Sequence, residues 1–263
     1  MSRIKTIARQ RPVQAALSAF EAQRQEIVNL AIAVQQIPAP TFAEGARADY
    51  IEAKFRSLGL DDVGQDDLHN VYGRYAGTNP SLPPVVVSAH NDTVFAADTD
   101  LTVKRSNGHV YGPGIGDNST GVAGLFALLS ALKTHHLRPP ADIWLVSNSG
   151  EEGLGDLRGM RAVVERFGRD ATYIVVEGGL FGQISHQAIG VRRFRLTVTT
   201  PGGHSWGSFG TPSAIHILGQ AVAQITRLSV SSSPKTTYNV GVIEGGTSIN
   251  TIAAEASFLL DLR

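Results

Sequence analysis

Three short apolar runs dominate the first two thirds of the chain, and each is followed by residues that carry charge. In chain order, the runs and the residues after them are 84–89 with His90 and Asp92, 142–146 with Glu151 and Glu152, and 172–176 with Glu177. Unbroken apolar runs of this length are typical of strands that are covered on both faces. Because helical patterns separate the runs, we predict an α/β fold with a mostly parallel central sheet and helices on both faces.

The helical patterns have recognisable ends. Helical spacing of apolar residues covers 13–34, and a second helix is expected from Thr41, where Thr41 and Glu44 have the spacing of a capping box, to Gly59. A third helix is expected over 121–134, directly after Asp117. Asp117 therefore lies at the beginning of a helix.

The pattern changes near Gly190. The segment 191–200 alternates Arg and Thr with apolar residues, as does a strand with one face in water. A helix over 212–228 and strands over 236–243 and 253–262 follow, which describes a small α+β unit. We therefore expect two domains, 1–189 and 190–263.

Composition excludes several classes of function. Lys+Arg and Asp+Glu are both 23 among 263 residues, so overall charge does not favour nucleic acid or an anionic membrane as partner. No apolar run approaches the roughly 20 residues that cross a bilayer, and we expect a cytoplasmic protein. The chain has no Cys, so any metal must be bound by His, Asp and Glu.

The acidic residues after the strands are expected to meet. Open α/β sheets bind ligands beyond the carboxyl ends of their strands. Carboxylates that converge there repel one another, and a divalent cation is the simplest way to neutralise them. The sequence therefore predicts a metal site in this crevice.

Each residue suits a separate task in such a site. Asp92 lies two residues after His90 and could accept a hydrogen bond from the ring nitrogen of His90 that does not bind metal. Asp117 could bridge two metals. Of the adjacent pair, one of Glu151 and Glu152 could bind metal while the other moves a proton between water and the leaving amine.

Glu177 and the chemical types of the ligands indicate how many metal ions are bound and which metal is preferred. Glu177 would complete the shell of a second metal ion. Imidazole and carboxylate ligands without thiolates favour zinc, with cobalt and manganese as alternatives.

These motifs together resemble a known family, the co-catalytic zinc hydrolases that include aminoacylase, carboxypeptidase G, peptidase T and succinyl-diaminopimelate desuccinylase. The matching stretches are SAHNDTV at 88–94, GIGDNS at 114–119, SGEEG at 149–153, PGGHS at 201–205 and GGTSIN at 245–250. The resemblance covers nearly the whole chain. It implies a zinc-peptidase-like catalytic domain with a lid or dimerisation domain.

The resemblance also implies roles for individual residues. Two zinc ions per subunit are expected, with Asp117 bridging them, His90 on one side, and Glu152 and Glu177 on the other. Glu151 would be the general base and Asp92 would orient His90.

In the second domain, His204 would stabilise the oxyanion, often from across a homodimer interface. Asn250 and Arg263 would bind a substrate carboxylate. The expected reaction is hydrolysis of an amide bond next to a free carboxylate, in a small peptide or an N-acyl amino acid.

Two departures from the family leave an alternative open. After Asp117-Asn118 the chain has Ser119-Thr120, where many members have Asp-Lys-Gly, and a minority pattern with Asn-Ser resembles this one. Family members also continue beyond the position of Arg263 and supply a last His ligand, so both domains are expected to be incomplete at the C-terminus. The alternative function is a truncated, catalytically impaired protein that binds metal or a partner.

Overall fold

The computed structural model of the chain describes residues 3–178 and 182–263. Its contacts form two compact units, Met1–Phe181 and Gly182–Arg263. The change in sequence pattern suggested a division near Gly190, where the alternating segment begins. Each unit has its own hydrophobic core.

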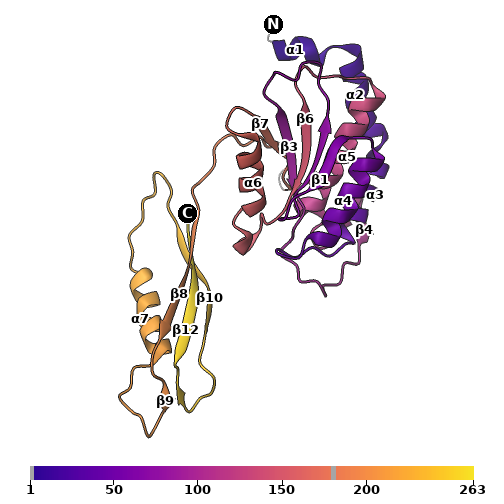
Figure 1. The fold of residues 1–263 in the computed structure, drawn as a ribbon. Helices are drawn as coiled ribbons and strands as arrows, with labels where there is room; N and C mark the ends of the chain where they lie inside the picture. Colours follow the sequence, from indigo (N-terminus) through magenta and orange to yellow (C-terminus); the bar gives the residue numbers. More distant parts are fainter. Residues whose placement is uncertain (1–2, 179–181) are drawn as a thin grey trace. The chain divides into compact units, whose positions relative to one another are not determined.

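A five-stranded sheet forms the centre of the first unit (Figure 1). Its strands in spatial order are β1 (Asp61–Gln65), β2 (Val71–Tyr75), β6 (Ile143–Asn148), β3 (Val85–His90) and β7 (Thr172–Val175). β3 is parallel to both β6 and β7, whereas β2 is antiparallel to both of its neighbours. Every strand except β2 therefore runs in the same direction, which confirms the predicted mixed α/β fold with its mostly parallel sheet.

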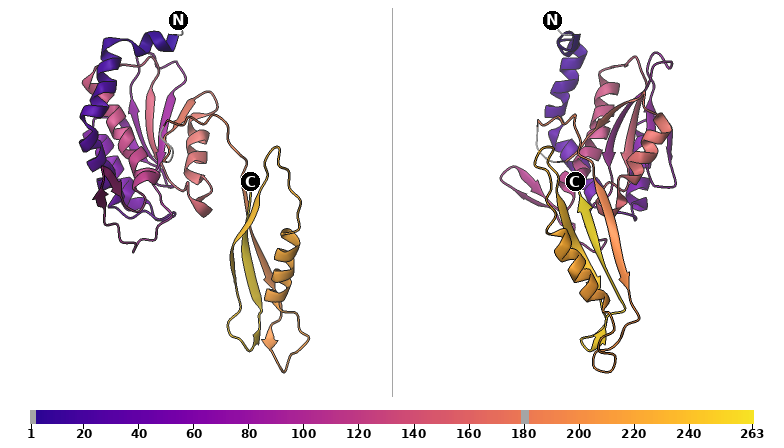
Figure 2. Two further views of the ribbon diagram at one scale, coloured as in Figure 1. Left: turned by 180° about the vertical axis from the view of Figure 1, so that it is seen from behind. Right: turned by 90° about the vertical axis from the view of Figure 1, so that its left-hand side faces the viewer.

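Helices cover both faces of this sheet (Figures 1 and 2). Helices α3 (Arg24–Gln35), α4 (Gly45–Ser57) and α5 (Thr120–Thr134) share the larger core on one face, where the Phe55 and Phe126 rings meet edge to face at 5.8 Å. On the opposite face, α6 (Arg158–Phe167) packs against β6, and the rings of Trp144 and Phe167 are 5.1 Å apart.

Two expectations about helices were wrong. The pattern over 13–34 is two helices, α2 (Arg11–Ala22) and α3, which are separated by Gln23; neither Gly nor Pro marks this break in the sequence. A short helix, α1 (Arg3–Ala8), precedes them. The proposed capping box does not form, because α4 begins at Gly45 and the Thr41 hydroxyl donates to Asp92 instead.

Helix α5 is rich in apolar residues. Against expectation, the 20-residue stretch Ile115–Thr134 contains a segment with the length and composition of a membrane span. More than half of that stretch is buried, and α5 packs against α3 and β3. The core of the first unit accounts for its apolar character.

Shorter elements complete the first unit. They are the hairpin β4 (Lys104–Ser106) and β5 (His109–Tyr111), a π-turn at Ile115–Ser119 and a 3₁₀ turn at Gly153–Gly155.

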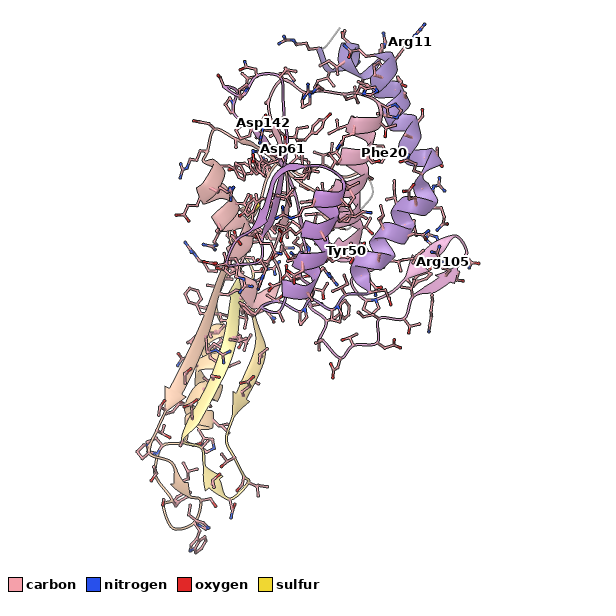
Figure 3. The ribbon with its side chains drawn as sticks, turned by 45° about the vertical axis from the view of Figure 1, so that its right-hand side comes forward. Arg11, Phe20, Tyr50, Asp61, Arg105 and Asp142 are labelled. Carbon is pink, nitrogen blue, oxygen red and sulfur yellow. The ribbon has the colours of Figure 1, made fainter. Side chains whose placement is uncertain are left out.

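Paired charges lie at the end of the sheet where β1 and β6 begin. Arg74 Nε is 2.6 Å from Asp62 Oδ2, and the same guanidinium is 3.8 Å from Asp61 and 3.6 Å from Asp142. Asp61 and Asp142 are labelled in Figure 3. We call Arg74, Asp61, Asp62 and Asp142 the Arg74 cluster.

The second unit is a three-stranded antiparallel sheet with one helix. Its strands in spatial order are β10 (Tyr238–Gly245), β12 (Glu255–Leu262) and β8 (Arg192–Thr199). Helix α7 (Ala214–Ile225) buries Leu218 with Phe258 of β12. A short pair, β9 (Gly203–His204) and β11 (Thr251–Ile252), lies beyond the sheet. The α+β character agrees with the alternating sequence pattern.

Candidate metal centre

The predicted site residues of the first unit lie where its parallel strands end. β3 ends at His90, β6 leads into the turn with Glu151 and Glu152, and Glu177 follows β7 closely. Asp117 lies in the turn before α5. The topology of the sheet therefore brings these segments to one edge, as the sequence indicated.

The His90 ring is buried and held at both nitrogens. Nε2 lies 2.8 Å from Asp117 Oδ1 and 3.3 Å from Glu177 Oε1. Nδ1 lies 3.0 Å from the backbone oxygen of Asp92 and 3.4 Å from its Oδ1. Because Nδ1 faces Asp92, Nε2 is the nitrogen directed at Asp117 and Glu177. Nε2 is therefore the nitrogen available to a metal.

The Asp92 carboxylate is fully buried and organises the neighbouring turn. Oδ1 accepts from the backbone N–H of Glu151 and Oδ2 from that of Glu152, both at 3.0 Å. The Thr41 hydroxyl donates to Oδ2 at 2.9 Å. Burial raises the pKa of Asp92, but these hydrogen bonds and that of His90 outweigh it, and the pKa lies below its ordinary value.

The pair of glutamates after β6 is shifted in the opposite direction. Burial is the largest cause that raises the pKa of Glu151, and the charges of Glu177 and Asp92 add to it. Burial and the charge of Asp117 raise the pKa of Glu152. Both carboxylates therefore hold protons more tightly than exposed glutamates do.

The acids around His90 favour its protonated, positively charged form. Burial lowers the pKa of His90, but hydrogen bonds and charges from Asp92 and Glu177 outweigh it and raise the pKa to about 11. An imidazole that stays protonated far above its usual range shows how strongly the surrounding acids attract positive charge.

The donor atoms are close enough to share a metal ion. One ligand atom each from His90, Asp117 and Glu152 lie within 4.8 Å of one another. Glu177 lies beside the same His90 nitrogen, whereas the resemblance had placed it with Glu152. Imidazole and carboxylate donors without a thiolate fit zinc, cobalt or manganese.

Asn118, and not Asp117, accepts a hydrogen bond from the first turn of α5. Asn118, which follows a cis peptide bond, caps α5 through its Oδ1, which accepts from the Gly121 N–H at 3.0 Å. Asn118 Nδ2 donates to the backbone oxygen of Val176 and joins the turn to the end of β7. Gly178 lies against this turn, and a Cβ there would come within 2.4 Å of the backbone oxygen of Gly116. Asp117 is therefore not the helix cap that an acid at this position usually is.

Some residues of this region had no signal in the sequence. Thr41 belongs to a loop that bonds with Thr93: the Thr41 N–H donates to the Thr93 backbone oxygen, and the Ala39 backbone oxygen accepts from the Thr93 N–H. Arg47 is buried, and its guanidinium donates to the backbone oxygens of Asn91 and Ile37. Thr41 and Arg47 lie far from the metal motifs in the sequence, so no spacing between them and the motifs would reveal these contacts.

The remaining predicted residues lie in the second unit. His204 Nδ1 accepts from the backbone N–H of Trp206 and Gly207 at 3.3 and 3.4 Å. Asn250 is next to His204, since its backbone oxygen accepts from Ser205 N at 3.0 Å. Arg263 is paired with Asp261 at 2.8 Å.

Arg263 and Asn250 are not brought together. The eight residues of β12 separate them, a length of about 26 Å for an extended strand. A joint grip of one substrate carboxylate by the two side chains, which the resemblance implied, does not fit this arrangement.

Comparison with known proteins finds one peptidase family and relatives that belong to it or resemble it. The pattern of "Peptidase family M20/M25/M40" matches residues 86–258. An M20 peptidase domain protein of Sordaria macrospora is 29% identical over 247 residues, which cover 84% of this chain and 52% of the relative. Succinyl-diaminopimelate desuccinylase of Methylobacillus flagellatus is 25% identical over 218 residues, which cover 75% and 56%. The chain thus spans about half the length of these curated relatives.

Solved structures support the fold. The di-peptidase Dug1p of Saccharomyces cerevisiae superimposes with a TM-score of 0.68 at 13% identity, over 95% of this chain and 71% of that one.

Proposed function

The chain belongs to the peptidase family M20/M25/M40, and from that premise we propose that it takes part in metal-dependent hydrolysis of an amide bond next to a free carboxylate. The observation that supports this most is the meeting of Asp117, Glu152 and Glu177 around Nε2 of His90. Among the residues the structure describes, these acids form no ion pair with Lys or Arg. A divalent cation would balance their charge.

Two zinc ions suit this donor set best, with cobalt or manganese as substitutes. Because Asp117 and Glu177 both lie beside Nε2 of His90, we assign these three residues to one ion, and Asp117 with Glu152 to the second. His90 is the one histidine of this group in the described part of the chain. The last histidine ligand that the resemblance implies is therefore outside the group.

Zinc bound here would polarise the substrate carbonyl and lower the pKa of water. Glu151 takes the proton of the attacking water and passes it to the leaving amine. Its raised pKa brings it closer to the pH at which a group can both accept and return a proton. Asp92 fixes the backbone of Glu151 and Glu152, so the two carboxylates keep separate tasks.

His204 is suited to stabilise the oxyanion. Its Nδ1 accepts two backbone N–H groups, so the ring proton belongs on Nε2, where a neutral imidazole can donate. Asn250, its neighbour, is the better candidate for contacting a substrate carboxylate. We propose that the second unit also forms a homodimer interface, and that the protein is cytoplasmic.

The substrate is proposed to be a small peptide or an N-acyl amino acid. The names of the relatives, a desuccinylase and a di-peptidase, describe one substrate of each kind.

The base assignment is tested with Glu151→Gln. This substitution keeps the size of the side chain but removes its basicity, so turnover should fall by about 10²–10⁴-fold while zinc content stays unchanged. Glu165→Gln on the exposed side of α6 is the matched control and should keep both. Zinc content is measured by elemental analysis, and turnover with dipeptides and N-acyl amino acids.

Other outcomes separate the alternatives. If the Gln variant turns over normally with zinc bound, Glu151 is not the base. If zinc binds but the unmodified protein hydrolyses no amide, the catalytically impaired metal-binding protein is the better description. If zinc, cobalt and manganese are all absent at any stoichiometry, the acids have only a structural role.

A further inference from the structure

Large apolar side chains are exposed on the loops that carry the metal centre. They are Phe42, Val94, Leu154 and Leu157, exposed by 58, 69, 54 and 45%, and we call them the apolar rim. Phe42 follows Thr41, Val94 lies two residues after Asp92, and Leu154 lies two residues after Glu152. Hydrogen bonds from Thr41 and Glu152 to Asp92 bring the three loops together.

Phe42 is held in an unusual conformation. Its φ is +77°, in the left-handed region that costs free energy for a bulky side chain. The residues on either side fix it there, because Thr41 is bonded to Asp92 and Glu44 is completely buried. The backbone thus keeps an aromatic ring in solvent against its own preference.

One face of the Phe42 ring lies on a rigid support. The Arg158 guanidinium carbon is 4.5 Å from the ring centroid, and its Nη2 donates to both carboxylate oxygens of Glu44 at 2.9 Å. The stem of Arg158 lies against Gly150, where an added Cβ would come within 2.6 Å of it. The ring is therefore anchored to the residue that precedes the proposed base, Glu151.

A purely structural role explains only part of this. Stacking on Arg158 covers a buried ion pair, but a ring in that role would gain from further burial, and Phe42 remains more than half exposed. It also leaves the exposure of Val94 and Leu154 unexplained. Apolar groups next to polar catalytic groups are typical of pockets that bind a small molecule.

We propose that the apolar rim binds a large apolar group of the substrate, and that Phe42 is a specificity-determining residue. The proposal rests on the proposed amide hydrolysis and narrows its substrate class to N-acyl amino acids or peptides with a long or aromatic apolar group beside the scissile bond. The loops that bear the rim are joined through Asp92, whose carboxylate lies 3.4 Å from Nδ1 of His90.

The test is the preference for N-octanoyl over N-acetyl forms of one amino acid, measured as the ratio of their kcat/KM values. Phe42→Gly removes the ring and relieves the backbone, so the ratio should fall about tenfold or more while the free energy of unfolding is equal or higher. Leu82→Gly, an exposed loop leucine before β3, is the matched control and should keep the ratio. An unchanged ratio in Phe42→Gly, including an equal loss of kcat/KM on both substrates, would overturn the proposal.

A binding measurement separates this proposal from the hydrolysis itself. In the Glu151→Gln background, calorimetry measures the affinity for N-octanoyl and N-acetyl amino acids in the absence of turnover. Weaker binding of the octanoyl form after Phe42→Gly supports the rim even if hydrolysis is not found. Equal affinity for the two forms before the substitution contradicts it even if hydrolysis is found.

Discussion

The two ends of the central sheet both gather acids but balance them differently. In the Arg74 cluster, three aspartates surround one guanidinium within 3.8 Å. At the opposite end, Asp117 and Glu177 pair with His90, whereas Glu151 and Glu152 form no ion pair in the described part of the chain. Acids outnumber the cationic partner at both ends; at the second end His90 and Asp92 are buried, whereas Asp117 and Glu177 are exposed.

The protonation of these groups shows what the difference means. The hydrogen bond from Arg74 to Asp62 raises the pKa of that guanidinium, so the charged state is favoured. Burial and neighbouring charges raise the pKa of Glu151 and Glu152, so their charged state is disfavoured. The Arg74 cluster contributes to folding by itself, whereas the proposed metal centre is expected to need a further cation.

The largest effect on stability is expected at Asp92. Asp92→Ala removes a buried acceptor of two backbone N–H groups and a partner of His90, which should lower the free energy of unfolding by about 3–5 kcal/mol. Denaturant unfolding measures this in the presence of a chelator. Asp61→Ala in the exposed part of the Arg74 cluster should cost no more than about 1 kcal/mol. Equal losses would show that the two ends do not differ.

A comparable effect should follow pH and is spread over several pH units. The pKa of His90 is raised from 6.5 to about 11, so the stability that its protonation provides is fully present below pH 6.5 and is lost as pH rises toward 11. Without metal, this loss should reach about 1.4 kcal/mol per pH unit. Between pH 7 and 10, the slope of the unfolding free energy against pH should be absent in His90→Gln and retained in Asp142→Asn. Superimposable curves for His90→Gln and the unmodified protein would contradict the assignment.

The smallest effect is expected for Arg74. Arg74→Gln leaves three aspartates without their cation and makes this end of the sheet resemble the other. Because the pairs are partly exposed, the loss should be about 1 kcal/mol at low salt and smaller at high salt. A loss that is independent of salt would show that Arg74 acts through packing and not through charge.

The fold and the site differ in how far the sequence reveals them. Apolar runs that end in charged residues are local signals, so they identify β3, β6 and β7 and the acids that meet beyond them. The Thr41 hydroxyl, by contrast, bonds across 51 positions to Asp92, and no local pattern encodes such a contact. The break at Gln23 also lacks a turn residue that would announce it.

The placement of side chains could be predicted least. The resemblance implied that Glu177 joins Glu152, but the parallel pairing of β7 with β3 places it next to His90. Similarly, Asn250 and Arg263 are close in sequence, yet one extended strand places them far apart. Spacing along the chain gives the residue types of a site, and the register of the strands decides which of them meet.

The central claim is that the acids beyond β3, β6 and β7 are balanced by a metal ion. It is tested by the gain in unfolding free energy when zinc replaces chelator, in the unmodified protein, Glu152→Gln and Asp142→Asn. Zinc at a hundred times its Kd should stabilise the unmodified protein by about 2.7 kcal/mol. Glu152→Gln should lose most of this gain without losing stability in chelator, and Asp142→Asn should keep the gain although it is less stable in chelator. Equal gains in the two variants, or no gain in the unmodified protein, would contradict the account.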